Sequence, residues 1–194
     1  MISSIKTSDN TSIDDIVLFS TRLYTKDNFL PLPLLSHLSE IAEDKANVDD
    51  DLLKRSVIDF GLGALRADNV DLEHYESIEL SEIWFNVLDA GGHHWDHTHA
   101  NHILSGVIYL TDDCFTIFGD PRPAASVLSL TYKNPNPGSI RSFVHHGKKN
   151  SIVTFPSWLG HRVATSQKSR TTIAFNLMLH GLFGGAHSRE QIRL

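Results

Sequence analysis

The sequence has little that would suit a disulfide-bonded, membrane-spanning or nucleic-acid-binding protein. Its single cysteine, Cys114, excludes an intramolecular disulfide. Its longest apolar runs fall far short of the roughly 20 residues that cross a bilayer. The net charge of -6 and the pI near 6.0 argue against a polyanionic nucleic acid as the main partner. We therefore expect a protein that binds neither nucleic acid nor a membrane.

An export signal is also missing from residues 1–10, which have neither a basic start nor an apolar stretch. Together with the lone cysteine, this indicates the reducing cytoplasm as the expected location. A length of 194 residues, with 41% hydrophobic and 21% charged residues, is typical of one globular domain. We expect a single domain over residues 1–194, with a strand and supporting helices in 1–76, a β-rich core in 77–180 and a tail in 181–194.

The N-terminal third predicts a scaffold rather than a site. Residues 13–24 contain an apolar, strand-forming run. Apolar residues then recur at three- and four-residue spacing over 34–42, which predicts an amphipathic helix opened by Pro33. A second helix is expected from Asp50 to about Arg66, with acidic residues at the positive end of its dipole. We expect both helices to cover one side of a sheet, and we assign neither a chemical role.

The histidines are concentrated in one stretch. Five of the twelve lie in residues 93–102, HHWDHTHANH, directly ahead of an apolar, β-prone run. Core packing does not explain this density. Alternate residues of an extended chain point to one side, so His97 and His99 are spaced to share a metal ion. His94 and Asp96 have the same spacing in the other parity.

Two distant residues complete the layout of a metal site. His161 follows a turn-like Pro-Ser-Trp-Leu-Gly segment and precedes two short β-prone runs. Arg170 stands nine residues further on, and a guanidinium is a rigid fork that matches a carboxylate with two hydrogen bonds. A His-x-(His or Asp) pair, a distant histidine and such an arginine are the layout of a non-haem iron(II) site with a 2-oxoglutarate pocket.

Beyond residue 77 the hydrophobic period changes to two, as in strands. After ESIELSEIWFNVLDAGG, short β-prone runs alternate with clusters of Gly, Pro and Asn: ILSGVIYL, CFTIF, SVLSL, SIVTF, HRVAT and TTIAFNLML. Many short strands without a helical pattern between them predict an antiparallel sandwich or barrel. With metal ligands in its mouth, this is a cupin-like jelly roll, so the predicted fold class is mostly β with N-terminal helices.

Four motifs within residues 84–176 are specific as a set: HTHANHILSGVIYL, GDPR, FPSWLGH and RTTIAFN. With them the chain resembles the 2-oxoglutarate/Fe(II)-dependent oxygenases, and more narrowly a small family of bacteria and phages that is distantly similar to prolyl hydroxylases. The resemblance implies a double-stranded β-helix with the helices packed outside it. It also implies Fe(II) and 2-oxoglutarate, with Arg170 on the distal carboxylate. The implied reaction consumes O2, releases succinate and CO2, and hydroxylates a C–H bond.

The usual ligand set of such an iron site is two histidines and a carboxylate, and the carboxylate is missing here. Two explanations are open. In the first, His97, His99 and His161 form a three-histidine site. In the second, Asp96 or Asp120 supplies the carboxylate and one histidine of the cluster lies outside the ligand sphere. We favour the first, because His97 and His99 share a parity and align with the H-x-H of the family.

The 2-oxoglutarate pocket is expected around Arg170. Thr172 lies two residues on, on the same strand face, and this pair resembles the Arg-x-Ser of many oxygenases in the superfamily. Other polar residues in half-buried strands must find a hydrogen-bond partner, and cosubstrate and core partners are both open for them. The cofactor-binding candidates are Arg170, Thr172, Asn86, Ser105, Tyr109 and Asn176.

The remaining histidines are expected to be peripheral. We place His93, His94 and His102 at the rim of the site or behind its ligands. His145 and His146 are expected at a solvated hairpin tip, without a chemical role. The apolar segment LMLHGLFGG near the C-terminus either covers a barrel edge or makes a homodimer contact.

The expected substrate is a protein or peptide side chain, with a free amino acid or another small molecule as the next choice. Two other functions stay open. A three-histidine cupin dioxygenase would not use 2-oxoglutarate, and Arg170 would have no role in it. A non-catalytic jelly-roll module would hold a structural metal, and such sites are closed by four protein ligands.

Overall fold

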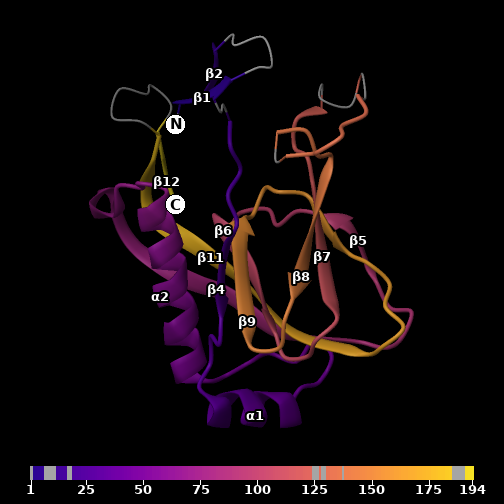
Figure 1. Cartoon of the computed structure of the whole chain (residues 1–194). Coiled ribbons are helices and arrows are strands. Elements are labelled where there is room, and N and C mark those ends of the chain that lie inside the picture. Colours follow the sequence, from indigo (N-terminus) through magenta and orange to yellow (C-terminus); the bar gives the residue numbers. More distant parts are fainter. Residues whose placement is uncertain are drawn as a thin grey trace.

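Two antiparallel sheets face one another in the computed structural model, and two helices pack against the larger sheet (Figure 1). The structure describes residues 2–6, 12–16, 19–123, 127, 130–136, 138–184 and 191–194. Within these residues, no helix is both long and apolar enough to span a membrane. The predicted mostly-β fold with N-terminal helices is confirmed.

Both predicted helices are present. Helix α1 spans Leu32–Glu40, with a proline in its first turn, and helix α2 spans Asp51–Ala67. Asp50 caps α2, because its Oδ1 accepts a hydrogen bond from the backbone N–H of Leu53 at 2.8 Å. A Cβ on Gly61 would lie 2.2 Å from Leu177 Cδ1, so this glycine allows α2 to lie close to the sheet.

The larger sheet is built around two long strands, β4 (Tyr75–Leu88) and β11 (Arg170–Phe183), and all its strand pairs are antiparallel. Strand β4 and strand β6 (Leu104–Tyr109) flank β11. Next to β6 follow β9 (Ser151–Pro156) and then β3 (Tyr24–Asp27). The outer face of this sheet and the apolar faces of the helices form the main hydrophobic core, which includes Leu38, Leu53, Val57, Phe85, Ile108, Ile152 and Ile173.

The smaller sheet has four strands in the order β5, β10, β7 and β8. They are β5 (His94–His97), β10 (His161–Val163), β7 (Cys114–Gly119) and β8 (Ser142–Gly147). A second apolar cluster, with Tyr109, Phe118 and Phe155, joins the two sheets.

Two features, one in the N-terminal region and one in β8, differ from expectation. The strand expected within 13–24 is divided, because β2 (Ser12–Ile16) pairs with β1 (Ile2–Lys6) and Tyr24 begins β3. The predicted strand SVLSL lies mostly outside the described residues. His145 and His146 lie within β8, opposite residues of β7, and not at a hairpin tip. A short 3-10 helix (Leu72–His74) precedes β4, and β12 (Ile192–Arg193) pairs with the end of β11.

The inward face of the larger sheet, opposite the helices, has three rows of side chains. They arise because β4, β11 and β6 pair in register there, and alternate residues of each strand point inward. We call them the arginine-side row, the apolar row and the buried polar row. They contain, in that order, Asn86, Thr172 and Tyr109; Trp84, Ala174 and Val107; and the buried Asn176 and Ser105 with the exposed Glu82 at their edge.

Candidate metal centre and its cavity

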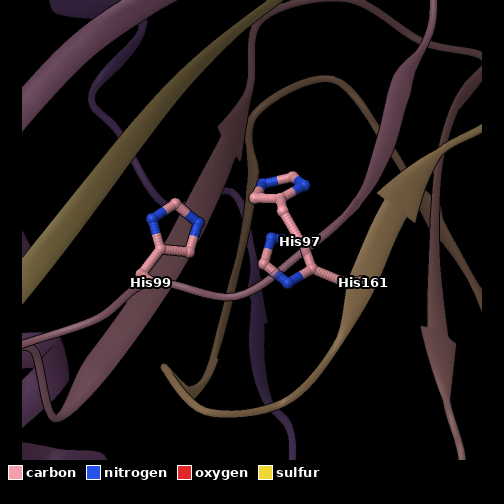
Figure 2. Close-up of side chains that lie close together, drawn as sticks. All are labelled: His97, His99 and His161. Carbon is pink, nitrogen blue, oxygen red and sulfur yellow. The ribbon is translucent and has the colours of Figure 1, made fainter.

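Three histidine rings meet between the sheets, at one end of the β5–β10 strand pair. His97 ends β5 and lies opposite His161, the first residue of β10. His99 follows two residues after His97, in the turn toward β6. One ring nitrogen of each lies within 4.8 Å of the others. Figure 2 shows the three rings converging on one point. Such a group has the spacing that one metal ion requires.

Hydrogen bonds fix the tautomers of two of these rings. A carbonyl oxygen only accepts, so His97 Nδ1 donates to the carbonyl of Trp95 at 2.7 Å. In the same way, His161 Nδ1 donates to the carbonyl of Leu159 at 2.9 Å. The proton on Nδ1 leaves the lone pair of Nε2 free for a metal. The backbone therefore orients two of the three rings before any ion binds.

Burial favours the neutral form of two of these rings, His161 and His99. His161 is 3% exposed, and its burial lowers its pKa to about 4. Burial also lowers the pKa of His99, and only the Glu82 carboxylate acts on it in the opposite direction. A neutral imidazole is the form that binds a metal, so protons do not compete with a metal for His161 near neutral pH.

A cavity of about 1100 Å³ opens beside the three histidines. This is slightly above the roughly 300–1000 Å³ typical of small-molecule sites, so one small cosubstrate would not fill it. The arginine-side row, the apolar row, Phe155 and Arg170 form much of its wall, and the segment from Lys45 to Asp49 contributes to its far side.

Arg170 is a buried cation with spare hydrogen-bond donors. Its side chain lines the cavity, and the residue is only 2% exposed. Nη2 donates to the carbonyl of Gly92 at 2.8 Å, whereas Nε and Nη1 have no hydrogen-bond partner among the described residues. Burial lowers its pKa, but a guanidinium stays charged in proteins. A carboxylate bound in the cavity would satisfy these donors and the charge.

The three residues of the arginine-side row lie beside this guanidinium, and all line the cavity. The Tyr109 hydroxyl is within 2.9 Å of Thr116 Oγ1. Asn86 Oδ1 accepts from Trp84 Nε1 at 3.2 Å. Thr172 lies between them, opposite Asn86 on β4 and opposite Tyr109 on β6. This end of the cavity thus combines one cation with several neutral polar groups.

Two of the cofactor-binding candidates, Ser105 and Asn176, do not line the cavity and have protein partners. Ser105 Oγ donates to Asn176 Oδ1 at 2.7 Å and lies 2.8 Å from Ser157 Oγ. Asn176 Nδ2 donates to Glu82 Oε2 at 2.6 Å. These contacts correspond to the core alternative left open by the sequence. Sequence reasoning missed Ser157 and Glu82, although Ser157 stands within FPSWLGH and Glu82 shares the parity of Trp84 on β4.

The two alternative carboxylate ligands are engaged by arginines. Asp96 has a 65% exposed side chain whose Oδ2 lies 3.3 Å from Arg162 Nη1. Asp120 accepts hydrogen bonds from Arg122 at 2.9 and 3.0 Å, and these bonds lower the pKa of Asp120 to about 2. Neither carboxylate belongs to the group of three histidines.

The other histidines of the cluster occupy different positions. His94 lines the cavity, and the His93 ring contacts the exposed Trp95. His102 Nε2 lies 4.0 Å from Glu82 Oε2. His145 is half-buried beside the Tyr109 ring, and its Nε2 has no hydrogen-bond partner within the described part of the chain.

Residues 82–176 match the family model described as "Putative 2OG-Fe(II) oxygenase". The matched segment contains the three histidines, Arg170 and all three rows of the inward face. Through this segment the chain belongs to the 2OG-Fe(II) oxygenase family. It is therefore an enzyme that uses Fe(II) together with 2-oxoglutarate and O2, which confirms the expected cofactors. A comparison with curated proteins found no match.

Solved structures share the fold at low sequence identity. A prolyl-4-hydroxylase from Pseudomonas putida has a TM-score of 0.59 and 14% identity, over 82% of this chain and 86% of that chain. HygX from Streptomyces hygroscopicus, with nickel and 2-oxoglutarate bound, has a TM-score of 0.55 and 10% identity, over 81% and 82%. AviO1 from Streptomyces viridochromogenes Tue57 has a TM-score of 0.56 and 9% identity, over 81% and 90%. The predicted double-stranded β-helix is thereby confirmed.

Proposed function

We propose that this oxygenase holds Fe(II) with His97, His99 and His161 and anchors the distal carboxylate of 2-oxoglutarate on Arg170. The main support for this proposal is that the three histidines and Arg170 line one cavity. Three ring nitrogens lie within 4.8 Å of one another there, and a buried guanidinium has two nitrogens without partners among the described residues. The donor set fits the metal and the spare N–H groups fit the carboxylate.

The bound iron would supply an oxidation in which 2-oxoglutarate, O2 and a substrate C–H bond give succinate, CO2 and a C–OH group. The chain supplies orientation and shielding. Three neutral imidazoles leave positions free for cosubstrate and oxygen. Arg170 fixes one end of the cosubstrate, which reduces the freedom lost during reaction. The apolar row and Phe155 line the space between these two groups and exclude water from it.

The proposal of an all-histidine ligand set is supported by the partners of the two aspartates. Asp96 is paired with Arg162, and Asp120 is paired with Arg122. Moving either carboxylate to the histidines would break these contacts. The three-histidine set is therefore the simpler arrangement, and it leaves the metal with more uncompensated positive charge than the usual set.

We propose a protein or peptide side chain, or a small molecule, as the hydroxylated substrate. The cavity of about 1100 Å³ extends past the histidines to Lys45, Asn47 and Trp84, which leaves room for either.

The all-histidine set also favours a second candidate, a three-histidine dioxygenase that does not use 2-oxoglutarate. That function would leave the buried Arg170 charge unsatisfied, which counts against it. A structural metal site is less compatible, because such sites have four ligands and the group among the described residues has three.

The test is succinate formation by the Fe(II)-loaded protein supplied with 2-oxoglutarate and O2. We expect slow succinate formation even without substrate, and none from His161→Ala. His146→Ala is the matched control, because it removes an exposed histidine of β8 that does not line the cavity. Oxygen consumption by the wild-type protein that is independent of 2-oxoglutarate would move the second candidate to first place.

A further inference from the structure

A directional chain of hydrogen bonds crosses the buried polar row. Asn176 Nδ2 donates to Glu82 Oε2 at 2.6 Å, because a carboxylate only accepts. Asn176 Oδ1 then accepts from the Ser105 hydroxyl at 2.7 Å. Since this bond uses the only proton of Ser105 Oγ, Ser157 Oγ must be the donor in their 2.8 Å contact. Every proton of the chain thus points toward the Glu82 carboxylate, an arrangement in which successive bonds strengthen one another.

The other end of this chain holds the segment that carries His99. The backbone N–H of His99 donates to the carbonyl of Ser157 at 3.0 Å. The backbone N–H of Ser157 donates to the carbonyl of Ile103 at 3.1 Å. Ser157 therefore fixes both ends of the turn between His99 and Ile103. Because Ser105, Asn176 and Ser157 are at most 1% exposed, water does not compete for these bonds.

Glu82 faces the cavity by the same alternation as Trp84 and Asn86, and a β-bulge ends this regular pairing directly beside it. Glu82 pairs with Asn176 and Leu80 pairs with Leu177, so Ser81 has no counterpart on β11. Bulges are common beside active sites. Glu82 lines the same cavity as His99. Trp84, the next inward residue of β4, has its ring 6.3 Å from the ring of His99.

We propose that Glu82 is a positioning residue of the metal site, which supplies from outside the ligand sphere the negative charge that three histidine ligands lack. Asn176, Ser105 and Ser157 hold its carboxylate beside the turn that carries His99. The inference rests on the proposed function, because it presumes a metal on the three histidines. A nearby carboxylate lowers the free energy of a bound dication, and partners outside the ligand sphere typically contribute about 10- to 100-fold in metal affinity.

The chain offers a closely matched control in Glu79. Both glutamates lie on β4, both side chains are 57% exposed, and each accepts or shares one 2.6 Å hydrogen bond, Glu82 with Asn176 and Glu79 with His180. Glu79 does not line the cavity. Glu82→Gln and Glu79→Gln therefore remove the same charge from the same strand, and only the first removes it from the cavity.

The experiment is a titration of the metal-free proteins with Co(II), followed by its visible absorption. We expect Glu82→Gln to raise the Co(II) dissociation constant about tenfold, the lower end of the range for such partners, because its side chain is partly in solvent. Glu79→Gln should change it by less than about twofold, as expected for an exposed surface charge. Ser157→Ala keeps the backbone hydrogen bonds but removes the hydroxyl that donates to Ser105. It should alter the Co(II) spectrum, and it should weaken Co(II) binding less than Glu82→Gln does.

The outcomes separate the two proposals. Equal dissociation constants for Glu82→Gln and Glu79→Gln would overturn the role of Glu82 and leave the metal site intact. Failure of the wild-type protein to bind Co(II), or binding that survives His161→Ala unchanged, would overturn the three-histidine site itself. Thermal unfolding of each metal-free variant shows that a change in affinity is not a loss of fold.

Discussion

The arginine-side row and the buried polar row lie on the same three strands, yet only the arginine-side row lines the cavity with all of its residues. Asn176 and Ser105 are bonded to each other, to Glu82 and to Ser157. Beside the arginine-side row, Arg170 keeps two nitrogens without partners among the described residues. Buried polar groups are normally satisfied by the protein. Among the described residues, Arg170 is the only arginine with buried nitrogens that lack a partner. We propose that it marks the end of the sheet that binds 2-oxoglutarate.

The largest expected effect comes from removing a histidine of the three-histidine site. His161→Ala should abolish 2-oxoglutarate-dependent succinate formation, because two histidines do not retain the iron. The protein should still fold, with a loss of about 2–4 kcal/mol in the free energy of unfolding from the cavity left beside Phe118 and Phe155. Iron content measures the loss of the metal, and urea unfolding measures the loss of stability. Full iron content in the variant would exclude His161 as a ligand.

A large effect is also expected from truncating Arg170, whose buried guanidinium has donors without partners among the described residues. Arg170→Ala should raise the KM for 2-oxoglutarate about 100-fold, since truncating one partner of a buried charge pair typically costs about 2–5 kcal/mol. Iron content should not change. Arg162→Gln removes an exposed arginine that pairs with Asp96, and it should leave this KM unchanged. An equal effect of both substitutions would show that Arg170 acts only through general charge.

Acid should destabilise the metal-free protein through the histidine centre. The pKa of His161 is lowered to about 4 in the folded state, against about 6.5 in an unfolded chain. The unfolded state therefore binds the extra proton first. The stability that this histidine contributes is full above pH 6.5 and is lost as the pH falls toward 4, by up to about 3 kcal/mol. Urea midpoints between these pH values should fall less steeply in His161→Ala than in His146→Ala.

The smallest pair of effects compares the two rows directly. Asn176→Leu should lower the free energy of unfolding by about 2–3 kcal/mol, because it leaves the Ser105 hydroxyl and the Glu82 carboxylate without their partner. Thr172→Val, on the same strand and face, should cost less than about 1 kcal/mol and raise the KM for 2-oxoglutarate instead. Urea unfolding of the metal-free proteins and steady-state kinetics distinguish these results. Similar losses of stability in both variants would remove the distinction between the rows.

Much of the fold follows from local patterns. The spacing of apolar residues and the acidic cap at Asp50 locate α2 to within one or two residues. Alternation locates β4, β6, β9 and β11. Strand β8 gives no such signal, because it lies at the sheet edge with Phe143 and Val144 exposed. Edge strands bury little, so their sequence carries little of the alternation on which prediction depends.

The site was predictable in part, for a different reason. His97, His99, His161 and Arg170 stand in motifs whose order and spacing resemble a known family. The distinction between cavity-facing Thr172 and internally bonded Asn176 is not visible in the sequence, since both have the same parity on one strand. It depends on which residues of β4 and β6 lie opposite each of them, and this pairing is set only when the sheet assembles. The bulge at Ser81, next to Glu82, arises only when β4 pairs with β11.

The central claim is that three histidines and Arg170 hold Fe(II) and 2-oxoglutarate in one cavity. Its most direct test is an anaerobic titration of metal-free protein with Fe(II) and then with 2-oxoglutarate, followed by the visible charge-transfer band of a chelated cosubstrate. We expect the band in the wild-type protein, no band in His161→Ala, and a band in Arg170→Ala only at about 100-fold higher 2-oxoglutarate. Bound iron that gives no band at any concentration of 2-oxoglutarate would contradict the claim.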